Sequence, residues 1–178
     1  MRGITFISVL ILALFSGCQK EKTPATSGTA TIESTLHGSG SYYADGFSFS
    51  KPGIVSTIST PGPDITLFAS KNLDGSFKET SFEASNFENS FSLVGESANE
   101  ADAIQSFKSL IIVGNVQWIA SAKPLERNQI WLFKTGMGRY NKMRIITVVE
   151  EMRQNLPYAS CTFEWVYQPD GSTTFPNL

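Results

Sequence analysis

The chain has 178 residues, a length that suits one domain of ordinary size with its own hydrophobic core. Hydrophobic residues make up 41% of the chain and charged residues 17%, which excludes a wholly disordered protein. The 14 Lys and Arg residues do not exceed the 16 Asp and Glu residues, so the chain lacks the basic surplus that nucleic-acid binding requires. One His and two Cys are too few for a recognisable metal site, and no catalytic set is evident.

The N-terminal segment 1–17 has the pattern of a cleaved signal peptide. A positive charge at Arg2 precedes an apolar run that is shorter than the ~20 residues of a membrane-spanning helix. The run ends in the sequence LFSGC, which resembles the lipobox of bacterial lipoproteins. This resemblance implies that Cys18 carries a diacylglycerol and anchors the protein to a membrane. An ordinary secretory leader with a free Cys18 is the alternative.

Residues 18–30 are predicted to form a tether between the anchor and the folded domain. The charged sequence QKEK at 19–22 resembles the signal that sends some Bacteroidetes lipoproteins to the cell surface, with a plain solvated spacer as the alternative. Residues 23–29 are rich in Pro, Gly, Ser and Thr, a composition typical of flexible spacers. If Cys18 is acylated, Cys161 has no partner, so the domain is expected to lack disulfides.

Residues 31–178 are predicted to form a single, mostly β, antiparallel domain, built as a sandwich or as curved sheets. Short segments of alternating polarity follow one another between turn residues, which is typical of all-β proteins. Before the C-terminal third, strands are predicted over residues 32–37, 47–50, 54–59, 65–70, 76–84, 87–94 and 111–120.

One stretch departs from this alternation, at residues 99–110. Ile104, Phe107 and Ile111 would share one face of a helix. Asn99 is a suitable N-cap, and acidic residues occupy the first turn, where the helix dipole favours them. The pattern predicts one short helix that covers a sheet face or closes a sheet end.

The C-terminal third has the clearest strand pattern. Segments 129–135 and 139–151 are joined by Gly-Met-Gly and predict a hairpin. Segment 158–168 alternates strictly, which predicts a strand with one buried face, and the turn after it should return 172–175 beside that strand. The residues expected on the buried face are Ala159, Cys161, Phe163, Trp165 and Tyr167, with Cys161 as an inert core residue.

Charge is distributed unevenly along the chain. Residues 74–102, the acidic segment, hold seven Asp and Glu residues against one Lys, whereas residues 123–153, the basic segment, hold seven Lys and Arg residues against three Glu. Two interpretations stay open. The segments either face water or each other across the domain, or the basic segment binds an anionic ligand.

Few residues are candidates for contact with a ligand. The single His, His37, precedes Gly-Ser-Gly without a nucleophile elbow, which favours a strand-end His over a catalytic one. Met137, at the hairpin tip, is either an exposed loop residue, a partner contact or a soft ligand of haem iron together with Met143. Tyr42 and Tyr43 are further candidates at the rim of a site. Core packing is favoured over sugar stacking for Trp118, Trp131 and Trp165.

Several motifs resemble the HmuY-like lipoproteins of Bacteroidetes, a family of all-β proteins. These motifs are QIWLFKT, RYNKMRI and FEWVYQPDGSTTF within 129–175, with YADGFSFS and PDITL nearer the N-terminus. The resemblance implies a β domain anchored at the outer membrane, and some members of the family are haemophores. Haem-binding members use His or Met from the middle of the chain, and residues 38–136 contain neither, so no family ligand maps onto this sequence.

The sequence thus predicts a lipid-anchored, non-catalytic protein on the extracellular face of the outer membrane. It would capture a ligand for nutrient uptake, with haem or another porphyrin as the candidate ligand and a TonB-dependent receptor as a candidate partner. The alternative is a scaffold lipoprotein that binds a transporter or an adhesin and no small molecule. A third hypothesis, a glycan-active enzyme, requires two carboxylates that face each other in a cleft.

Overall fold

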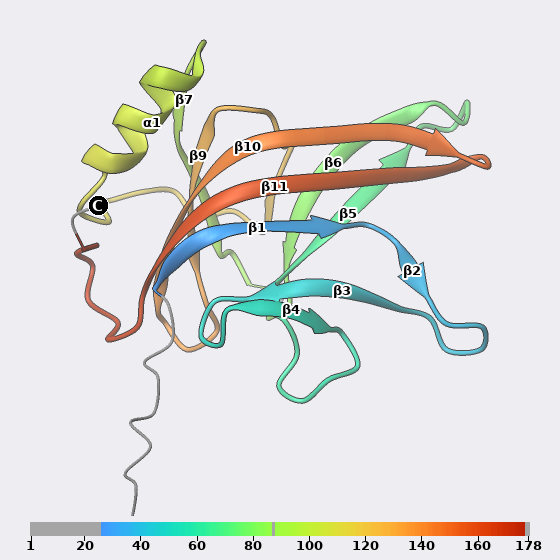
Figure 1. Cartoon of the computed structure of the whole chain (residues 1–178), viewed down its shortest axis with the longest axis horizontal. Coiled ribbons are helices and arrows are strands. Elements are labelled where there is room, and N and C mark those ends of the chain that lie inside the picture. The colour runs from blue at the N-terminus through green and yellow to red at the C-terminus, as the bar shows by residue number, and fades with distance from the viewer. Residues whose placement is uncertain (1–25, 87, 177–178) are drawn as a thin grey trace, which may run out of the picture.

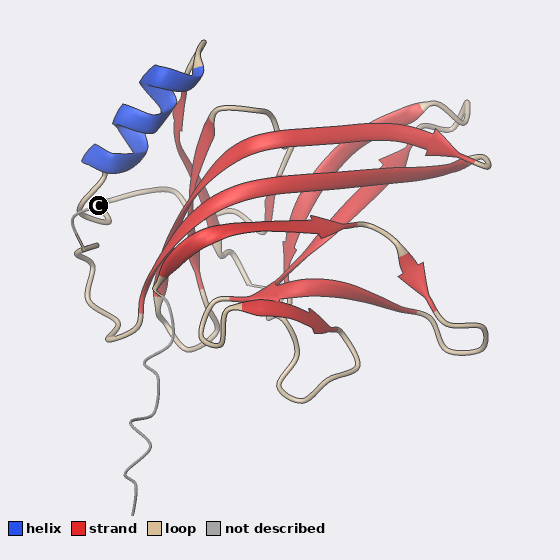
Figure 2. Ribbon diagram, in the orientation of Figure 1, coloured by secondary structure: helices blue, strands red, loops and turns tan. Residues whose placement is uncertain are grey.

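The computed structural model describes residues 26–86 and 88–176. The predicted signal peptide, Cys18 and most of the predicted tether lie outside these residues. Within them the chain is mostly β with one short helix, as predicted, and every strand pair is antiparallel (Figure 2).

The strands form two sheets that enclose the core (Figure 1). The first sheet has the order β1-β11-β10-β9-β7, and the second has the order β2-β3-β5-β6-β8, with β4 paired to β3. The elements are β1 (Ser27–Glu33), β2 (Leu36–His37), β3 (Tyr43–Ser48), β4 (Gly53–Ser56), β5 (Ile65–Lys71), β6 (Phe77–Ala84), β7 (Phe91–Glu96), α1 (Glu100–Ser109), β8 (Ser121–Ala122), β9 (Gln129–Lys134), β10 (Tyr140–Arg153) and β11 (Leu156–Gln168).

The alternating face of β11 forms the centre of the core, as predicted. Phe163 is fully buried, and its ring lies 5.3 Å from the ring of Phe82 and 5.6 Å from that of Phe47, each in an edge-to-face arrangement. Cys161 is buried beside it as a free thiol, and burial raises the pKa of this thiol. Aromatic rings from both sheets therefore interlock around one strand.

The helix α1 lies against the outer face of the first sheet, beside β7 and β9 (Figure 1). Asn99 is its N-cap, and the Asn99 side chain accepts a hydrogen bond of 2.9 Å from the Asp102 amide, as predicted. The predicted buried face is wrong in detail. Phe107 is buried, but its partner on the sheet side is Ala103, one turn earlier, whereas Ile104 is half-buried.

The C-terminal end of α1 rests on a buried lysine, Lys142 of β10. Its ammonium donates hydrogen bonds of 2.8 Å to the carbonyl oxygens of Phe107 and Leu110, and it lies over the rings of Phe107 and Phe175. Burial lowers the pKa of Lys142 to about 8, although the negative charge of Glu164 acts in the opposite direction. Lys142 thus supplies a donor for helix carbonyls that have no partner within the helix.

The acidic and basic segments meet across the domain. Lys123 pairs with Glu79 at 3.5 Å, and Arg127 pairs with Glu100 at 2.8 Å. Arg144, almost fully buried, lies 4.0 Å from the same Glu100. These contacts agree with the interpretation in which the two segments face each other.

The largest differences between predicted and observed strands occur in three segments. Residues 111–120 form isolated bridges and no strand, because their apolar side chains pack onto the outer face of the first sheet without a continuous ladder. Residues 172–175 do not return beside β11, and Thr174 instead bridges to Ile112. The strand predicted over 87–94 begins at Phe91.

The first strand also begins earlier than predicted. β1 starts at Ser27, inside the segment 18–30 that was expected to be a tether. Its small polar residues carry no strand signal, yet the whole of β1 is paired with β11, and Ala30 and Ile32 contact the core. Pairing with an already buried strand thus overrides the local composition.

Candidate functional site

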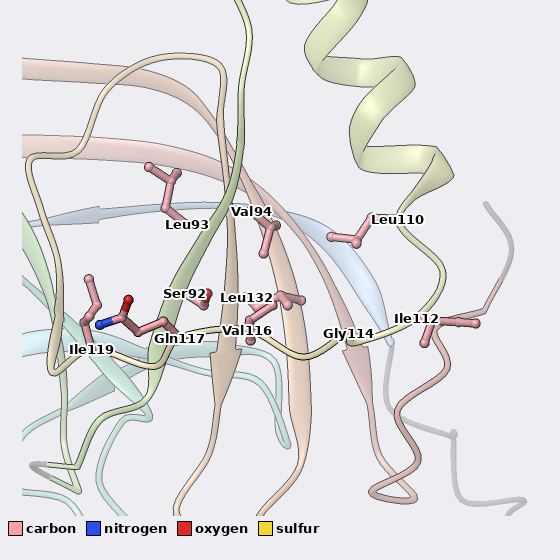
Figure 3. A pocket seen from close by; sticks show the side chains of 10 residues that line it. All are labelled: Ser92, Leu93, Val94, Leu110, Ile112, Gly114, Val116, Gln117, Ile119 and Leu132. Atoms are coloured by element: carbon pink, nitrogen blue, oxygen red, sulfur yellow. The ribbon is translucent and has the colours of Figure 1, made fainter.

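An open groove of about 600 Å³ runs beside β7 (Figure 3). β7 is an edge strand of the first sheet, and only β9 pairs with it over its full length. Leu132 of β9 and Val94 of β7 line one wall, and residues 110–119 form the other. The groove therefore lies along a sheet edge that would otherwise face solvent.

The groove exists because the segment 110–119 is held at its two ends. At one end, Ile119 and Phe91 exchange backbone hydrogen bonds of 2.7 and 3.0 Å. At the other end, the Val113 amide donates a hydrogen bond of 2.8 Å to the carbonyl oxygen of Thr173. Between these points the segment leaves β7, and the space between the two is the groove.

The lining is mostly apolar and partly exposed. Leu93 is 43% exposed, Ile112 55% and Ile119 37%, while Ser92 and Gln117 supply the polar atoms. Clustered apolar side chains that stay accessible, together with a few polar groups, are typical of binding sites. Sequence reasoning missed this site because it read Leu93, Ile112 and Ile119 as ordinary strand residues.

A second pocket of about 300 Å³ continues the groove toward α1. It shares Val94 and Leu110 with the groove and adds Glu96. Among the residues that line the two pockets, Glu96 is the single titratable side chain. Ser97, Ser106 and Ser109 add hydroxyl groups beside this carboxylate. The two pockets together thus combine apolar side chains with a few polar groups, a lining typical of binding sites.

The four predicted ligand contacts do not line this groove. Met143 is fully buried in the main core, because its position opposite Trp165 puts it on the inner face of the first sheet. Met143 is therefore not accessible to a ligand in this structure. Met137 is 69% exposed in the turn between β9 and β10, and it is the only one of the two methionines that could reach a partner.

The two tyrosines lie far from Met137. Tyr42 is 69% exposed in the β2–β3 connection, and Tyr43 stacks on His37 with a ring separation of 5.3 Å. This connection and the β9–β10 turn lie at opposite ends of the domain (Figure 1). The predicted residues thus belong to separate surfaces and form no common site.

His37 lies at the end of β2, as predicted, beside a smaller pocket of about 290 Å³. Its Nε2 atom is 3.4 Å from a carboxylate oxygen of Asp45, and Glu33 also lines the pocket. The pocket's one hydroxyl, on Thr31, is hydrogen-bonded to Thr162 at 2.8 Å, so no free nucleophile faces His37. In the described part of the chain, no three His, Cys, Asp or Glu residues are grouped to hold a metal ion.

The three tryptophans do not share one environment. Trp131 and Trp165 are core residues, as predicted. Trp118 is half-buried on the outer face of the first sheet, where its ring lies 6.1 Å from that of Tyr140 and 5.7 Å from the ammonium of Lys134. The prediction of a core strand was wrong for Trp118, because residues 111–120 form no strand.

The fold and the groove define a two-sheet β protein with an open, apolar groove at a sheet edge. Comparison with protein families, with curated proteins and with solved structures found no match to this chain. The likeness to HmuY-like lipoproteins stays a prediction from the sequence. No helix among the described residues is long and apolar enough to cross a membrane.

Proposed function

We propose that this protein is a lipid-anchored, non-catalytic binding protein on the extracellular face of the bacterial outer membrane. The sequence LFSGC at the end of an apolar leader supports the anchor at Cys18. The observation that carries the binding function is the groove beside β7, because its lining is apolar, accessible and nearly free of titratable groups. The groove is the proposed ligand site.

The shape and lining of the groove favour an elongated, mostly apolar ligand. Leu93, Val94 and Ile119 offer contact surface along its length, and burial of that surface would supply most of the affinity. Ser92 and Gln117 could each make a hydrogen bond that sets the orientation of the ligand.

The groove test uses a variant that places a charge in its wall. We expect Leu93→Asp to weaken binding of the apolar fluorophore N-phenyl-1-naphthylamine about tenfold or more, because the bound ligand would cover the carboxylate and remove it from water without giving it a partner. Fluorescence titration measures the change. Phe68→Asp is the matched control, since Phe68 is 59% exposed on β5 and does not line the groove. Equal weakening in both variants would place the probe elsewhere.

Haem remains a candidate ligand, but the groove offers it no axial ligand. No His, Met, Cys or Tyr lines the groove. We therefore expect haemin titration to produce no six-coordinate, low-spin spectrum, and Met137→Ala to leave the Soret band unchanged. A sharp Soret shift at one equivalent that is lost in Met137→Ala would contradict this and make Met137 an iron ligand.

Protein binding is the second candidate function, and one observation favours it. The outer side of β7 pairs with another segment at a single bridge, between Phe91 and Ile119. An extended segment of a transporter or adhesin could add to this edge as a further strand, with its apolar side chains in the groove. A photo-crosslinker at Leu93 in intact cells tests this, and crosslinks to lipid or small molecules alone would count against a protein partner.

A further inference from the structure

The chain enters the domain at one definite end. The carbonyl oxygen of Thr26 accepts a hydrogen bond of 2.7 Å from the amide of Tyr167, and β1 begins at the next residue. Tyr167 lies opposite Asn141, near the start of β10. We call this end, with the turns 135–139 and 169–172 and the β6–β7 turn, the anchor end.

The chain between Cys18 and Thr26 is too short for the domain to stand upright on its opposite tip. Eight residue steps separate Cys18 from Thr26, so a fully extended chain spans at most about 28 Å. β11 has 13 residues, which puts the far tip of its hairpin with β10 roughly 40 Å from the anchor end. If Cys18 is acylated, as the proposed function holds, the domain cannot stand upright on its far tip, and the anchor end is the end that is held near the bilayer.

The turns of the anchor end lie close together around Met137. A Cβ atom on Gly171 would lie 4.0 Å from the Gly138 carbonyl oxygen, and one on Gly136 would lie 3.4 Å from the Cβ of Asn86. Met137, between the two glycines of its turn, is 69% exposed. The accessible, flexible thioether side chain of Met137 thus lies at the end of the domain that the lipid anchor would hold near the bilayer.

We propose that the anchor end is a membrane-contact face and that Met137 inserts into the bilayer that holds the lipid anchor. The anchor keeps the face at high local concentration near lipid, so one apolar side chain is enough to orient the domain. The charged residues of the three turns are Arg139, Asp170 and Glu88, and the β3–β4 connection at the same end (Figure 1) adds Lys51, so two bases stand against two acids. The contact therefore depends on apolar insertion and not on attraction to anionic headgroups.

The consequence is a fixed orientation of the whole protein. The tips of the β5–β6 and β10–β11 hairpins, which a hydrogen bond between Lys71 and the Asn155 carbonyl joins, point away from the membrane. Leu73 and Leu156 are exposed at these tips. A spin label at Leu73 therefore serves as the control for one at Met137.

The test uses the full, acylated protein in vesicles of phosphatidylethanolamine and phosphatidylglycerol. A nitroxide is attached at Met137→Cys or, as the control, at Leu73→Cys. No further cysteine needs to be removed, because Cys161 is buried and Cys18 carries the lipid. The ratio of collision with oxygen to collision with a water-soluble nickel chelate reports depth in the bilayer. We expect this ratio to be several-fold higher at position 137 than at position 73, and to persist in about 1 M NaCl.

Failure of this inference can be separated from failure of the proposed function. Suppose that the protein floats with the vesicles but that the label at position 137 is as accessible to the nickel chelate as the label at 73. The proposal of a membrane-contact face would then be wrong, and the proposal of a lipid anchor would still be supported. A high ratio that disappears in salt would contradict apolar insertion. If the wild-type protein from native cells does not float at all, the anchored function is wrong, and the membrane-contact face falls with it.

Discussion

Replacement of Phe163 with alanine should lower the free energy of unfolding by about 3–5 kcal/mol. Phe163 is fully buried at the centre of the core, and edge-to-face contacts join it to Phe47 and Phe82 of the second sheet. Truncation removes these contacts and leaves a cavity between two sheets that cannot approach each other, because the other rings hold them apart. Urea unfolding, followed by tryptophan fluorescence, measures the loss.

Phe68→Ala is the matched control for this prediction. Phe68 is also a strand phenylalanine, but it is 59% exposed, so its removal should change the unfolding free energy by no more than about 0.5 kcal/mol. Similar losses in both variants would mean that Phe163 is not central to the core and that the arrangement of the two sheets is wrong.

Lys142→Met should lower the free energy of unfolding at pH 7 by about 1–3 kcal/mol. The variant keeps a side chain of similar length but removes the donor to the carbonyl oxygens of Phe107 and Leu110, which then stay buried without a partner. The last turn of α1 should loosen first. Hydrogen exchange of the α1 amides should therefore become faster in the variant, together with the loss in stability.

The same lysine should make stability depend on pH in the alkaline range. The pKa of Lys142 is about 8 in the folded protein against an ordinary value of 10.5. Between these values the unfolded chain binds a proton that the folded protein has released, so the unfolding free energy rises with pH. Below pH 8 the lysine is protonated in both states and contributes no slope. From pH 7 to pH 10, wild type should gain about 2 kcal/mol relative to Lys142→Met.

Lys134→Met separates this effect from the general titration of lysines. Lys134 lies on the neighbouring strand β9 and is half-exposed, so its ammonium group is accessible to water. The difference between wild type and Lys134→Met should stay constant from pH 7 to pH 10. A constant difference for Lys142→Met as well would show that Lys142 stays charged in the fold.

Local patterns were sufficient to predict much of the fold. β11 was predictable because every second residue from Ala159 to Tyr167 is apolar. Over that length, an apolar residue at every second position indicates a β-strand with one buried face. The start of α1 was predictable from Asn99 and the acids that follow it, since capping is a local interaction. The β9–β10 hairpin was predictable from the glycines that flank Met137.

The errors arose where tertiary contacts outweigh local pattern. Residues 111–120 are apolar enough for a strand, but the structure uses them to cover the outer face of the first sheet, where Val113 and Val116 pack with Val166. Composition cannot distinguish a paired apolar segment from a packed one. The burial of Met143 also required the register between β10 and β11, which the sequence of one strand does not contain.

The candidate site could not be predicted for a related reason. Its walls come from β7, β9 and the segment 110–119, which meet only after the first sheet has formed. The prediction from the sequence depended on chemically distinctive side chains and therefore selected Met137, Met143, Tyr42 and Tyr43. The groove is made of common apolar residues, and only their exposure in the folded protein distinguishes them.

Because β1 pairs with β11, the first sheet cannot be completed before β11 has been synthesised. Ser27 lies opposite Val166 and Glu33 opposite Ser160, so the first strand of the domain has to wait for the last. A nascent chain that emerges N-terminus first cannot complete this sheet until β11 has been made, and closing so long a loop is slow. If the chain is exported, as we propose, this delay keeps the polypeptide unfolded while it crosses the inner membrane. Loss of the final strand, by a premature stop codon, would leave β1 and β10 as exposed, aggregation-prone edges.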